Sequence, residues 1–527
     1  MIMWLNRFWL LSCVVVVHLS GRPVSGSGEF YTAGVAEFRP AVFGGSSEQL
    51  LEDNLNGYLE LIAGANGTSD ILVFPEATLN SVLQLTAVPE QTEHSLCEAH
   101  EGDDPRVAEF LRRLACAARD ARTYLVVNVK ERAEEHATAS TDRGYNIYNT
   151  NVVFDRQGAV LSRYRKWNLY LEPLTNRTQT AELATFRTDF GVTFGHFICF
   201  DMLFYTPAQE LVDRLGIRHV IVTKMFNSEL PFLTASQLQQ GWAWANNVTL
   251  LAAGASMPLA GISGSGIYDG QQGALTRIMV SHRAEGQRQL LLAQVPTDGS
   301  QGTSTPTEEE ESPSTVQLKL LQQPDIGSFS TWALPLVNGS AASKRLCQAD
   351  LCCDFQLSWN LLGAQAEYHY RLGVSVAERR YEQEQYSSIR VCGLFACRDD
   401  SLESCGLLSN QLEGHGGGVE FTSLRISGEF VKRPRRLLMP NTLTYGLYAL
   451  QPSEVAWTMQ EVPANDSHTH TQLELRQPQR QLLTFALYGN YFEEFASNGV
   501  AAVWRGMLTL CLLLAISMHL PILCNSF

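Results

Sequence analysis

An acidic stretch rich in serine and threonine, residues 297–315, divides this chain into two parts of different character. The stretch (TDGSQGTSTPTEEEESPST) holds four consecutive glutamates and two prolines but no basic or aromatic residue. Such a composition cannot bury enough apolar surface to offset the conformational entropy lost on ordering. We interpret it as a flexible linker between two domains; the alternative is a long loop inside one domain.

The two parts differ in their hydrophobic periodicity. Upstream, strand-like and helix-like segments alternate: residues 30–38 and 71–74 are β-like, and residues 46–62, 105–121 and 232–246 are helix-like. The first helical segment places Leu51, Leu55, Leu59 and Ile62 on one face behind a capping box of Ser46 and Gln49. This alternation is typical of an α/β layered domain. Downstream, short alternating stretches with few convincing helices predict a mostly β domain. A chain of 527 residues with 45% hydrophobic content can bury more than one core.

Both ends of the chain have the patterns of processing signals. Residues 1–26 carry one early positive charge, an apolar core too short to cross a bilayer, and small residues, which predicts a signal peptide. Residues 498–527 predict a glycolipid-anchor signal, with Ser497 or Asn498 as the attachment residue. A single membrane-spanning helix is the alternative, but the last four residues offer no basic side chain to hold a cytoplasmic side. We therefore expect a protein on the outer face of the cell membrane.

The cysteines support secretion and single out one thiol. Processing at both ends would remove Cys13, Cys511 and Cys524 from the 12 cysteines and leave nine. An oxidising compartment would pair eight of them as four disulfides, with zinc ligation as the less favoured alternative. Cys97 with Cys116 is the parsimonious bridge in the N-terminal half, and the pairing of the other six stays open: Cys347, Cys352, Cys353, Cys392, Cys397 and Cys405. Cys199 is left without a partner, and an odd cysteine in a secreted protein indicates that its free thiol has a function.

Glycosylation motifs and charge fit the same location. The chain has five Asn-X-Ser/Thr sequons, at Asn66, Asn176, Asn247, Asn338 and Asn465. The formal net charge of -15 argues against a nucleic-acid partner and suits a solvated extracellular surface. We expect neither a metal nor a cofactor.

Chemically capable residues follow three of the predicted strands. Glu76 comes directly after residues 71–75, Lys166 after residues 160–165, and Cys199 after residues 191–198. Functional sites gather at strand ends in α/β layers. Taken singly, each residue has an ordinary explanation, because a Pro-Glu pair is often a turn, a basic run is often solvated, and a cysteine among apolar residues is usually part of a core.

Taken together, these residues and their neighbours resemble a known family. The matching strings are FPE at residues 74–76, RYRKWNLYLE at 163–172, FGHFICFDMLF at 194–204 and GSGIY at 264–268. In type, order and context they resemble the carbon-nitrogen hydrolases, or nitrilase superfamily, and most closely its secreted branch of biotinidases and pantetheinases (vanins). The resemblance implies an α/β fold, with a nitrilase-type αββα sandwich at residues 28–296, a linker at 297–315, and a smaller, mostly β, disulfide-rich domain at 316–496.

The resemblance also implies a catalytic triad. Cys199 is the expected nucleophile, Glu76 the proton acceptor, and Lys166 the proton donor and oxyanion stabiliser, assisted by the backbone N–H of Phe200. Glu172 is expected to orient the lysine. These residue types also suit amide hydrolysis without reference to a family. A thiol divides the reaction into two steps with lower barriers through a thioester, but it needs a nearby base.

Two local features limit the interpretation. His196 and Cys199 would point to opposite faces of one strand, so we exclude a Cys-His pair. Where relatives typically have Thr-Ala-Trp, this chain has Lys224, Met225 and Phe226. A lysine and a smaller aromatic change the charge and the shape of this candidate acyl-binding wall. The resemblance therefore does not imply that this chain shares its relatives' specificity for biotinyl amides or for pantetheine.

The favoured function is an extracellular amidohydrolase that cleaves a small secondary amide, pantetheine-like or biotinyl, through a Cys199 thioester. The alternative is a cell-surface interaction protein on an inactive hydrolase scaffold, with the β domain as its binding module. The intact triad argues against that alternative. A cysteine protease is a weaker third reading, because no histidine is suitably placed.

Overall fold

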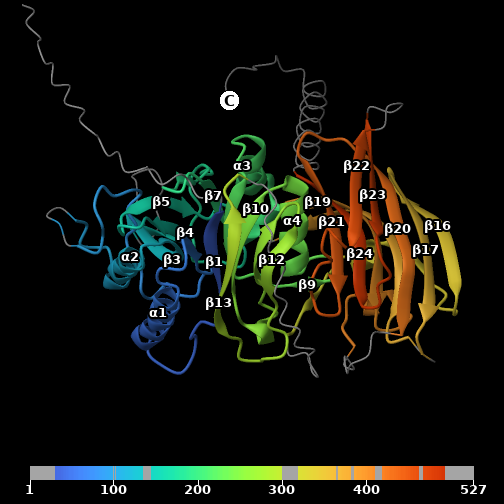
Figure 1. Ribbon diagram of the computed structural model, residues 1–527, viewed down its shortest axis with the longest axis horizontal. Helices are drawn as coiled ribbons and strands as arrows, with labels where there is room; N and C mark the ends of the chain where they lie inside the picture. Colours follow the sequence, from blue (N-terminus) through green and yellow to red (C-terminus); the bar gives the residue numbers. More distant parts are fainter. Residues whose placement is uncertain are drawn as a thin grey trace, which may run out of the picture.

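The computed structural model describes residues 30–98, 100, 103–134, 144–298, 318–363, 366–381, 385–409, 418–461 and 467–492. These residues form two domains that lie side by side along the long axis of the molecule (Figure 1). The predicted signal peptide, the predicted anchor signal with Ser497 and Asn498, and residues 299–315 of the predicted linker lie outside the described residues. Within the described ranges, no helix has both the length and the apolar character needed to cross a bilayer.

The N-terminal domain has the alternating strands and helices that the sequence predicts. Its main helices are α1 (Ser47–Gly64), α2 (Glu109–Ala121), α3 (Glu210–Asp213) and α4 (Ala235–Asn246). Its strands are β1 (Phe30–Phe38), β2 (Ile71–Val73), β3 (Tyr124–Glu134), β4 (Tyr145–Phe154), β5 (Val160–Arg165), β6 (Thr185–Arg187), β7 (Thr193–Ile198), β8 (His219–Lys224), β9 (Glu229–Leu230), β10 (Thr249–Ala255), β11 (Ser265–Asp269), β12 (Gly273–Ile278) and β13 (Arg288–Pro296).

One mixed sheet, in the order β5-β4-β3-β2-β1-β10-β8-β7-β6, forms both central layers of this domain. Its halves join only through the short pairing of β1 with β10, and they face each other, because Tyr124 on β3 stacks on Phe186 on β6 with ring centroids 6.5 Å apart. Apolar residues of both halves share the space between them. Helices α1 and α2 cover one outer face, and α3 and α4 cover the other. The predicted αββα sandwich is therefore confirmed.

Helix ends follow local capping chemistry. The capping box at Ser46 and Gln49 is confirmed as the start of α1. Helix α4 begins at Ala235 and not at residue 232, because Thr234 forms a second capping box with Gln237. Helix α2 begins at Glu109 and not at residue 105, because Asp104 accepts the backbone N–H of Arg106 and holds these residues in a turn.

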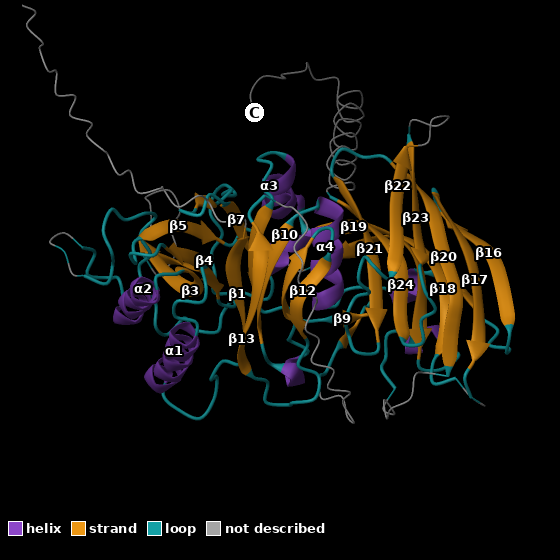
Figure 2. Ribbon diagram, in the orientation of Figure 1, coloured by secondary structure: helices purple, strands orange, loops and turns teal. Residues whose placement is uncertain are grey.

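The C-terminal domain is the mostly β, disulfide-rich domain that was predicted (Figure 2). Its inner sheet has the order β15-β18-β19-β24-β21, and its outer sheet has the order β16-β17-β20-β23-β22. The inner strands are β15 (Ser330–Ala333), β18 (His369–Arg380), β19 (Tyr386–Cys397), β21 (Arg436–Thr444) and β24 (Leu482–Tyr491). The outer strands are β16 (Ser340–Gln348), β17 (Leu351–Leu361), β20 (Val419–Val431), β22 (Val455–Glu461) and β23 (His468–Leu475).

All eight cysteines that were expected to pair do so. The predicted Cys97–Cys116 bridge is confirmed. The pairing that the sequence left open is now resolved as Cys347–Cys352, Cys353–Cys392 and Cys397–Cys405. The Cys353–Cys392 bridge joins β17 of the outer sheet to β19 of the inner sheet, so it ties the two layers of the sandwich together. Cys199 is the free cysteine of the described part of the chain.

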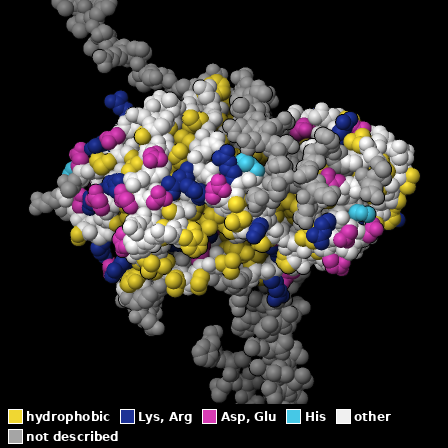
Figure 3. Space-filling view, turned by 90° about the horizontal axis from the view of Figure 1, so that it is seen from below, with side chains coloured by type: hydrophobic (Ala, Val, Ile, Leu, Met, Phe, Trp, Pro, Cys, Tyr) yellow, Lys and Arg dark blue, Asp and Glu magenta, His cyan; other side chains and the backbone are white. Residues whose placement is uncertain are grey.

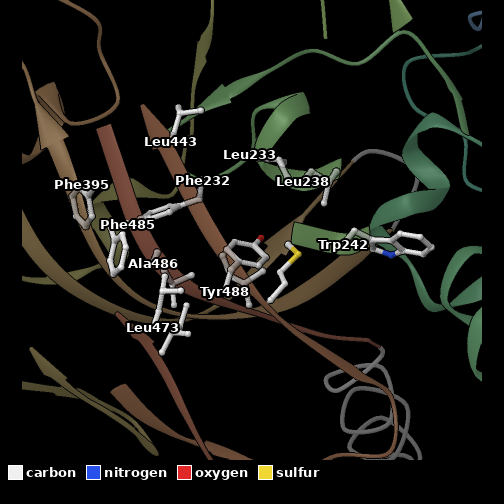
Figure 4. Packing of buried hydrophobic residues seen from close by; sticks show 14 of the residues in the cluster. Phe232, Leu233, Leu238, Trp242, Phe395, Leu443, Leu473, Phe485, Ala486 and Tyr488 are labelled. Atoms are coloured by element: carbon white, nitrogen blue, oxygen red, sulfur yellow. The ribbon is translucent and has the colours of Figure 1, made fainter. Parts of the chain in front are cut away.

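A single apolar core joins the two domains. Figure 4 shows Phe232, Leu238 and Trp242 from the N-terminal domain against Phe395 and Phe485 from the inner sheet. The rings of Phe232 and Phe395 meet edge to face with centroids 5.5 Å apart. Such packing contributes through buried apolar area and through ring geometry. On the face seen in Figure 3, acidic and basic side chains are interspersed with groups of hydrophobic ones.

The chain enters the C-terminal domain along the surface of the first domain. Strand β14 (Leu321–Gln322) pairs in parallel with β9. Gln323 then donates its backbone N–H to the carbonyl of Leu230 over 2.8 Å and accepts the N–H of Phe232 on its side chain. This segment therefore belongs to the interface between the domains.

Helix α4 and strand β21 approach so closely that only glycine fits at the contact. A Cβ on Gly241 would lie 2.6 Å from the carbonyl oxygen of Pro440. We expect Gly241→Ala to destabilise the protein by about 1–3 kcal/mol, because helix and strand must separate. The control is Gly64→Ala near the end of α1, where a Cβ meets nothing within 4 Å; it should stabilise slightly, as alanine does in helices. Thermal denaturation followed by circular dichroism measures both, and equal stabilisation by the two variants would contradict this interface.

Candidate active site

The fold brings the three predicted triad residues together at one edge of the sheet. Strands β2, β1, β10, β8 and β7 run parallel, so their carboxyl ends share this edge. Glu76 follows β2, and Cys199 follows β7 directly. Lys166 follows β5 and reaches the same point, where its Nζ donates to Glu76 Oε1 over 2.7 Å. All three side chains are buried.

The Lys166 ammonium lies between two carboxylates. Besides Glu76, it donates over 2.7 Å to Oε1 of Glu172, the residue that is expected to orient the lysine. Burial opposes the charge on Lys166, but Glu172 and Glu76 outweigh it and raise its pKa well above its usual value. Two of the three ammonium N–H groups are engaged in these bonds, which leaves one for a further acceptor.

Two residues that the sequence did not single out complete this charge network. Asn149 on β4 donates to Glu76 Oε1 over 2.7 Å and to Glu172 Oε2 over 2.8 Å. Lys130 on β3 donates to Glu172 Oε2 over 2.8 Å. Polar residues inside an otherwise apolar strand, as at residues 149–151, were the signal that could have identified Asn149.

A buried aspartate holds the turn that carries the nucleophile. Cys199 opens a short 3₁₀ turn (Cys199–Leu203) and adopts a φ of 48°, a left-handed conformation that is costly for a residue with a side chain. Asp201 Oδ2 accepts the N–H of Ile198 over 3.1 Å and the hydroxyl of Tyr164 over 2.7 Å. Its Oδ1 accepts the N–H of Asn168 over 2.8 Å, which joins this turn to the loop of Lys166.

The Cys199 thiol is poised beside a base. Burial, the charge of Glu76 and a hydrogen bond from the thiol to that carboxylate raise the pKa of Cys199 well above its usual value, although Lys166 opposes the shift. The backbone N–H of Met225 holds Glu76 from the other side, with 2.9 Å to Oε2. The site therefore contains a neutral thiol that is hydrogen-bonded to the Glu76 carboxylate.

Of the three predicted wall residues, Lys224 and the backbone of Met225 interact with Cys199. Lys224 ends β8, is only 3% exposed, and interacts electrostatically with Cys199 and Glu76. Phe226 is buried in the apolar core, and Met225 is half-buried.

The C-terminal domain supports the nucleophile turn, which the sequence did not predict. The ring of Tyr381, just beyond β18, meets the ring of Phe200 edge to face with centroids 4.9 Å apart. Gln385 donates to Asn168 Oδ1 over 3.1 Å, and Asn490 on β24 donates to the carbonyl of Leu203 over 2.8 Å. A signal for these contacts does not exist in local sequence, because each joins residues far apart in the chain.

The remaining predicted residues lie away from the thiol or on the surface. His196 contacts Ser162 through Nε2 over 2.9 Å and takes no part in the charge network. Of the sequons, Asn66, Asn247 and Asn338 are exposed and Asn176 is half-buried, while Asn465 lies outside the described residues. Across the described ranges, no cluster of His, Cys, Asp and Glu side chains could hold a metal ion.

The charges around Cys199 predict opposite pKa changes in two variants. Glu76→Gln removes a neighbouring negative charge, so the pKa of Cys199 should fall. Lys166→Met removes a positive charge, so the pKa should rise. Thiolate absorbance as a function of pH, with Cys199→Ala as the blank and circular dichroism as the check of folding, measures both. Shifts in the same direction would contradict the arrangement of charges described here.

Two family profiles match the chain, one in each domain. The carbon-nitrogen hydrolase profile matches residues 40–228, and the vanin C-terminal domain profile matches residues 318–495.

Full-length relatives agree with both profiles. Vanin-like protein 3 of Drosophila melanogaster is 61% identical, and the match covers 99% of this chain and 99% of that protein. The pantetheinase of Sus scrofa is 30% identical over 74% of this chain and 72% of its own length. The biotinidase of Rattus norvegicus is 27% identical over 89% of this chain and 94% of its own length. The chain therefore belongs to the vanin and biotinidase branch of the nitrilase superfamily of carbon-nitrogen hydrolases.

Proposed function

We propose that this protein is an extracellular amidohydrolase that cleaves a small secondary amide through a Cys199 thioester. The observation that carries the proposal is the buried contact of a free thiol, a carboxylate and an ammonium at one strand edge. The names of two relatives, pantetheinase and biotinidase, support a linear amide of vitamin-derived type as the substrate class.

The first half of the reaction forms the acyl-enzyme. Glu76 takes the thiol proton while Cys199 Sγ attacks the amide carbon, and the carbonyl oxygen becomes an oxyanion. The free N–H of Lys166, together with the backbone N–H of Phe200, stabilises this oxyanion. Collapse breaks the C–N bond, the leaving amine takes the proton from Glu76, and a thioester remains on Cys199.

The second half returns the enzyme to its starting state. Glu76 takes a proton from a water molecule that attacks the thioester carbon, and Lys166 again stabilises the oxyanion. Collapse breaks the C–S bond, the acid leaves, and the proton held by Glu76 returns to the sulfur. Glu172 and Asn149 act as positioning residues, because they fix the Lys166 ammonium and the Glu76 carboxylate without contacting the substrate.

Loss of the nucleophile or of the oxyanion donor should stop turnover to different degrees. We expect Cys199→Ala to abolish hydrolysis of pantetheine-like and biotinyl amides, and Lys166→Met to slow it by roughly 100- to 1000-fold. Amine release measured by mass spectrometry over a panel of such amides, extended to amides with acidic acyl groups, tests this. In wild type, the acyl group should appear on the peptide that contains Cys199.

Controls separate chemistry from folding. Lys344→Met, in an outer strand of the C-terminal domain, should leave turnover unchanged, and each variant should melt cooperatively like wild type. If wild type releases no amine from any member of the panel and traps no acyl group, the enzyme proposal is wrong, and the interaction-protein alternative takes its place.

We also propose that the protein is held on the outside of the cell by a glycolipid at Ser497 or Asn498. The disulfides support an oxidising compartment. The exposed sequons at Asn66, Asn247 and Asn338 are accessible to glycosylation.

The anchor makes a simple biochemical prediction. Phosphatidylinositol-specific phospholipase C should release the protein from intact cells in active form, because the anchor joins it to the membrane only through lipid. Release is measured by immunoblotting of the medium, and a chain truncated after residue 496 should appear in the medium without the enzyme. Full-length protein that stays with the membrane after treatment would contradict a glycolipid anchor.

A further inference from the structure

We propose that Lys224 binds an anionic group, a carboxylate, on the acyl part of the substrate, so that this enzyme acts on amides whose acyl group is acidic. This inference rests on the proposed amide hydrolysis and specifies the charge of the acyl part, which the names of the relatives leave open. It concerns a residue that has no role in the triad chemistry itself.

The Lys224 ammonium is buried without a direct partner. Its residue is 3% exposed, and within the described part of the chain its Nζ forms no hydrogen bond or ion pair; its only interactions there are longer-range attractions to Glu37, Cys199 and Glu76. A buried ammonium that lacks hydrogen-bond acceptors is costly. A ligand that supplies an acceptor would remove that cost.

Glu37, the carboxylate that attracts Lys224 most strongly, is already engaged elsewhere. Its Oε1 accepts the hydroxyl of Ser263 over 2.6 Å, and its Oε2 accepts the hydroxyl of Ser265 over 2.6 Å and the N–H of Gly264 over 3.3 Å. These bonds turn the carboxylate toward the start of β11. Glu37 therefore compensates the charge of Lys224 at a distance and leaves its N–H groups free.

The backbone around Lys224 keeps space for the ammonium. A Cβ on Gly254 would lie 2.7 Å from Nζ, and a Cβ on Gly264 would lie 3.9 Å from it. Because neither residue has a side chain, Nζ occupies a place at the ends of β8 and β10 that any other residue at position 254 would fill. The ammonium is thus held beside the triad and away from bulk solvent.

This position suits the acyl part of a substrate better than the amine part. The acyl carbon becomes bonded to Cys199 in the first half and is released only at the end of the second, whereas the amine must leave before water enters. The Lys224 ammonium, enclosed by β8, β10 and β11 near Cys199, therefore lies beside the acyl part, which remains after the amine has left. The chemistry that satisfies a buried ammonium is a carboxylate, which forms charge-assisted hydrogen bonds.

A matched series of amides tests the proposal. Each pair shares one amine and one acyl chain, which ends either in a carboxylate or in the uncharged methyl ketone of the same shape, and the pairs increase in chain length. In wild type, kcat/KM should be higher for the carboxylate in at least one pair. Lys224→Met should lower that preference roughly 10- to 100-fold, mainly through KM, since recognition acts before the chemical step.

The pH dependence provides a test that needs no variant. Burial lowers the pKa of Lys224 to about 8, against the opposing charges of Glu37, Cys199 and Glu76. Helix α4 and strand β10, which pack beside it, contribute no titratable side chain. The ammonium is lost as the pH rises through this value, so the carboxylate-to-ketone ratio of kcat/KM should fall above about pH 8. Titration of Glu76, Lys166 and Cys199 affects kcat/KM equally for both amides of a pair, so it cancels in the ratio.

The outcomes are distinct. Lys344→Met on β16 is the control and should leave the preference intact. If wild type cleaves the ketone amides at least as well at every chain length, or if Lys224→Met lowers kcat equally for both members of a pair, the proposal for Lys224 is wrong while the amidase function stands. If wild type cleaves no amide of either kind, the proposed function itself has failed. Should Lys224→Met not fold, a ratio that stays flat with pH in wild type would overturn the proposal.

Discussion

The apolar core between α4 and the inner sheet of the sandwich is the interaction on which the rest of the molecule depends. Helix α4 is buried along nearly its whole length, and two of its glutamines donate to different domains: Gln240 to the carbonyl of Leu450, and Gln239 to that of Gly264. A helix buried on all sides is stable only where every neighbour is present. The two domains therefore depend on each other to fold. Contacts from Tyr381 and Asn490 of the C-terminal domain complete the turn at residues 199–203.

The candidate site contains a row of largely buried side chains whose charges alternate in sign. Lys130, Glu172, Lys166 and Glu76 follow one another at hydrogen-bond distance. Each charge is compensated only by its neighbours, so removal of one member leaves an uncompensated charge in a low-dielectric interior. Rigidity follows from this arrangement, and a rigid donor is what an oxyanion requires.

Local sequence predicted much of this architecture because short-range chemistry decides it. Strand β5, the capping box of α1 and the Cys97–Cys116 bridge are readable from periodicity, capping pairs and cysteine counting. The meeting of Glu76, Lys166 and Cys199 was predictable because strand ends converge in α/β layers. The contact of Tyr381 and the pairing of the C-terminal cysteines could not be predicted, since each depends on which distant strands become neighbours. The start of α2 was missed because Asp104 forms a turn where apolar spacing continues the helix.

The burial of Cys199 has a consequence for the lifetime of the protein. Oxidants and disulfides react with thiolates, so an exposed, ionised cysteine would not survive among four disulfides in an oxidising compartment. Here Cys199 is 7% exposed and its thiol keeps its proton next to the Glu76 carboxylate. The residue that activates the thiol in the proposed reaction thus protects it from oxidation between turnovers.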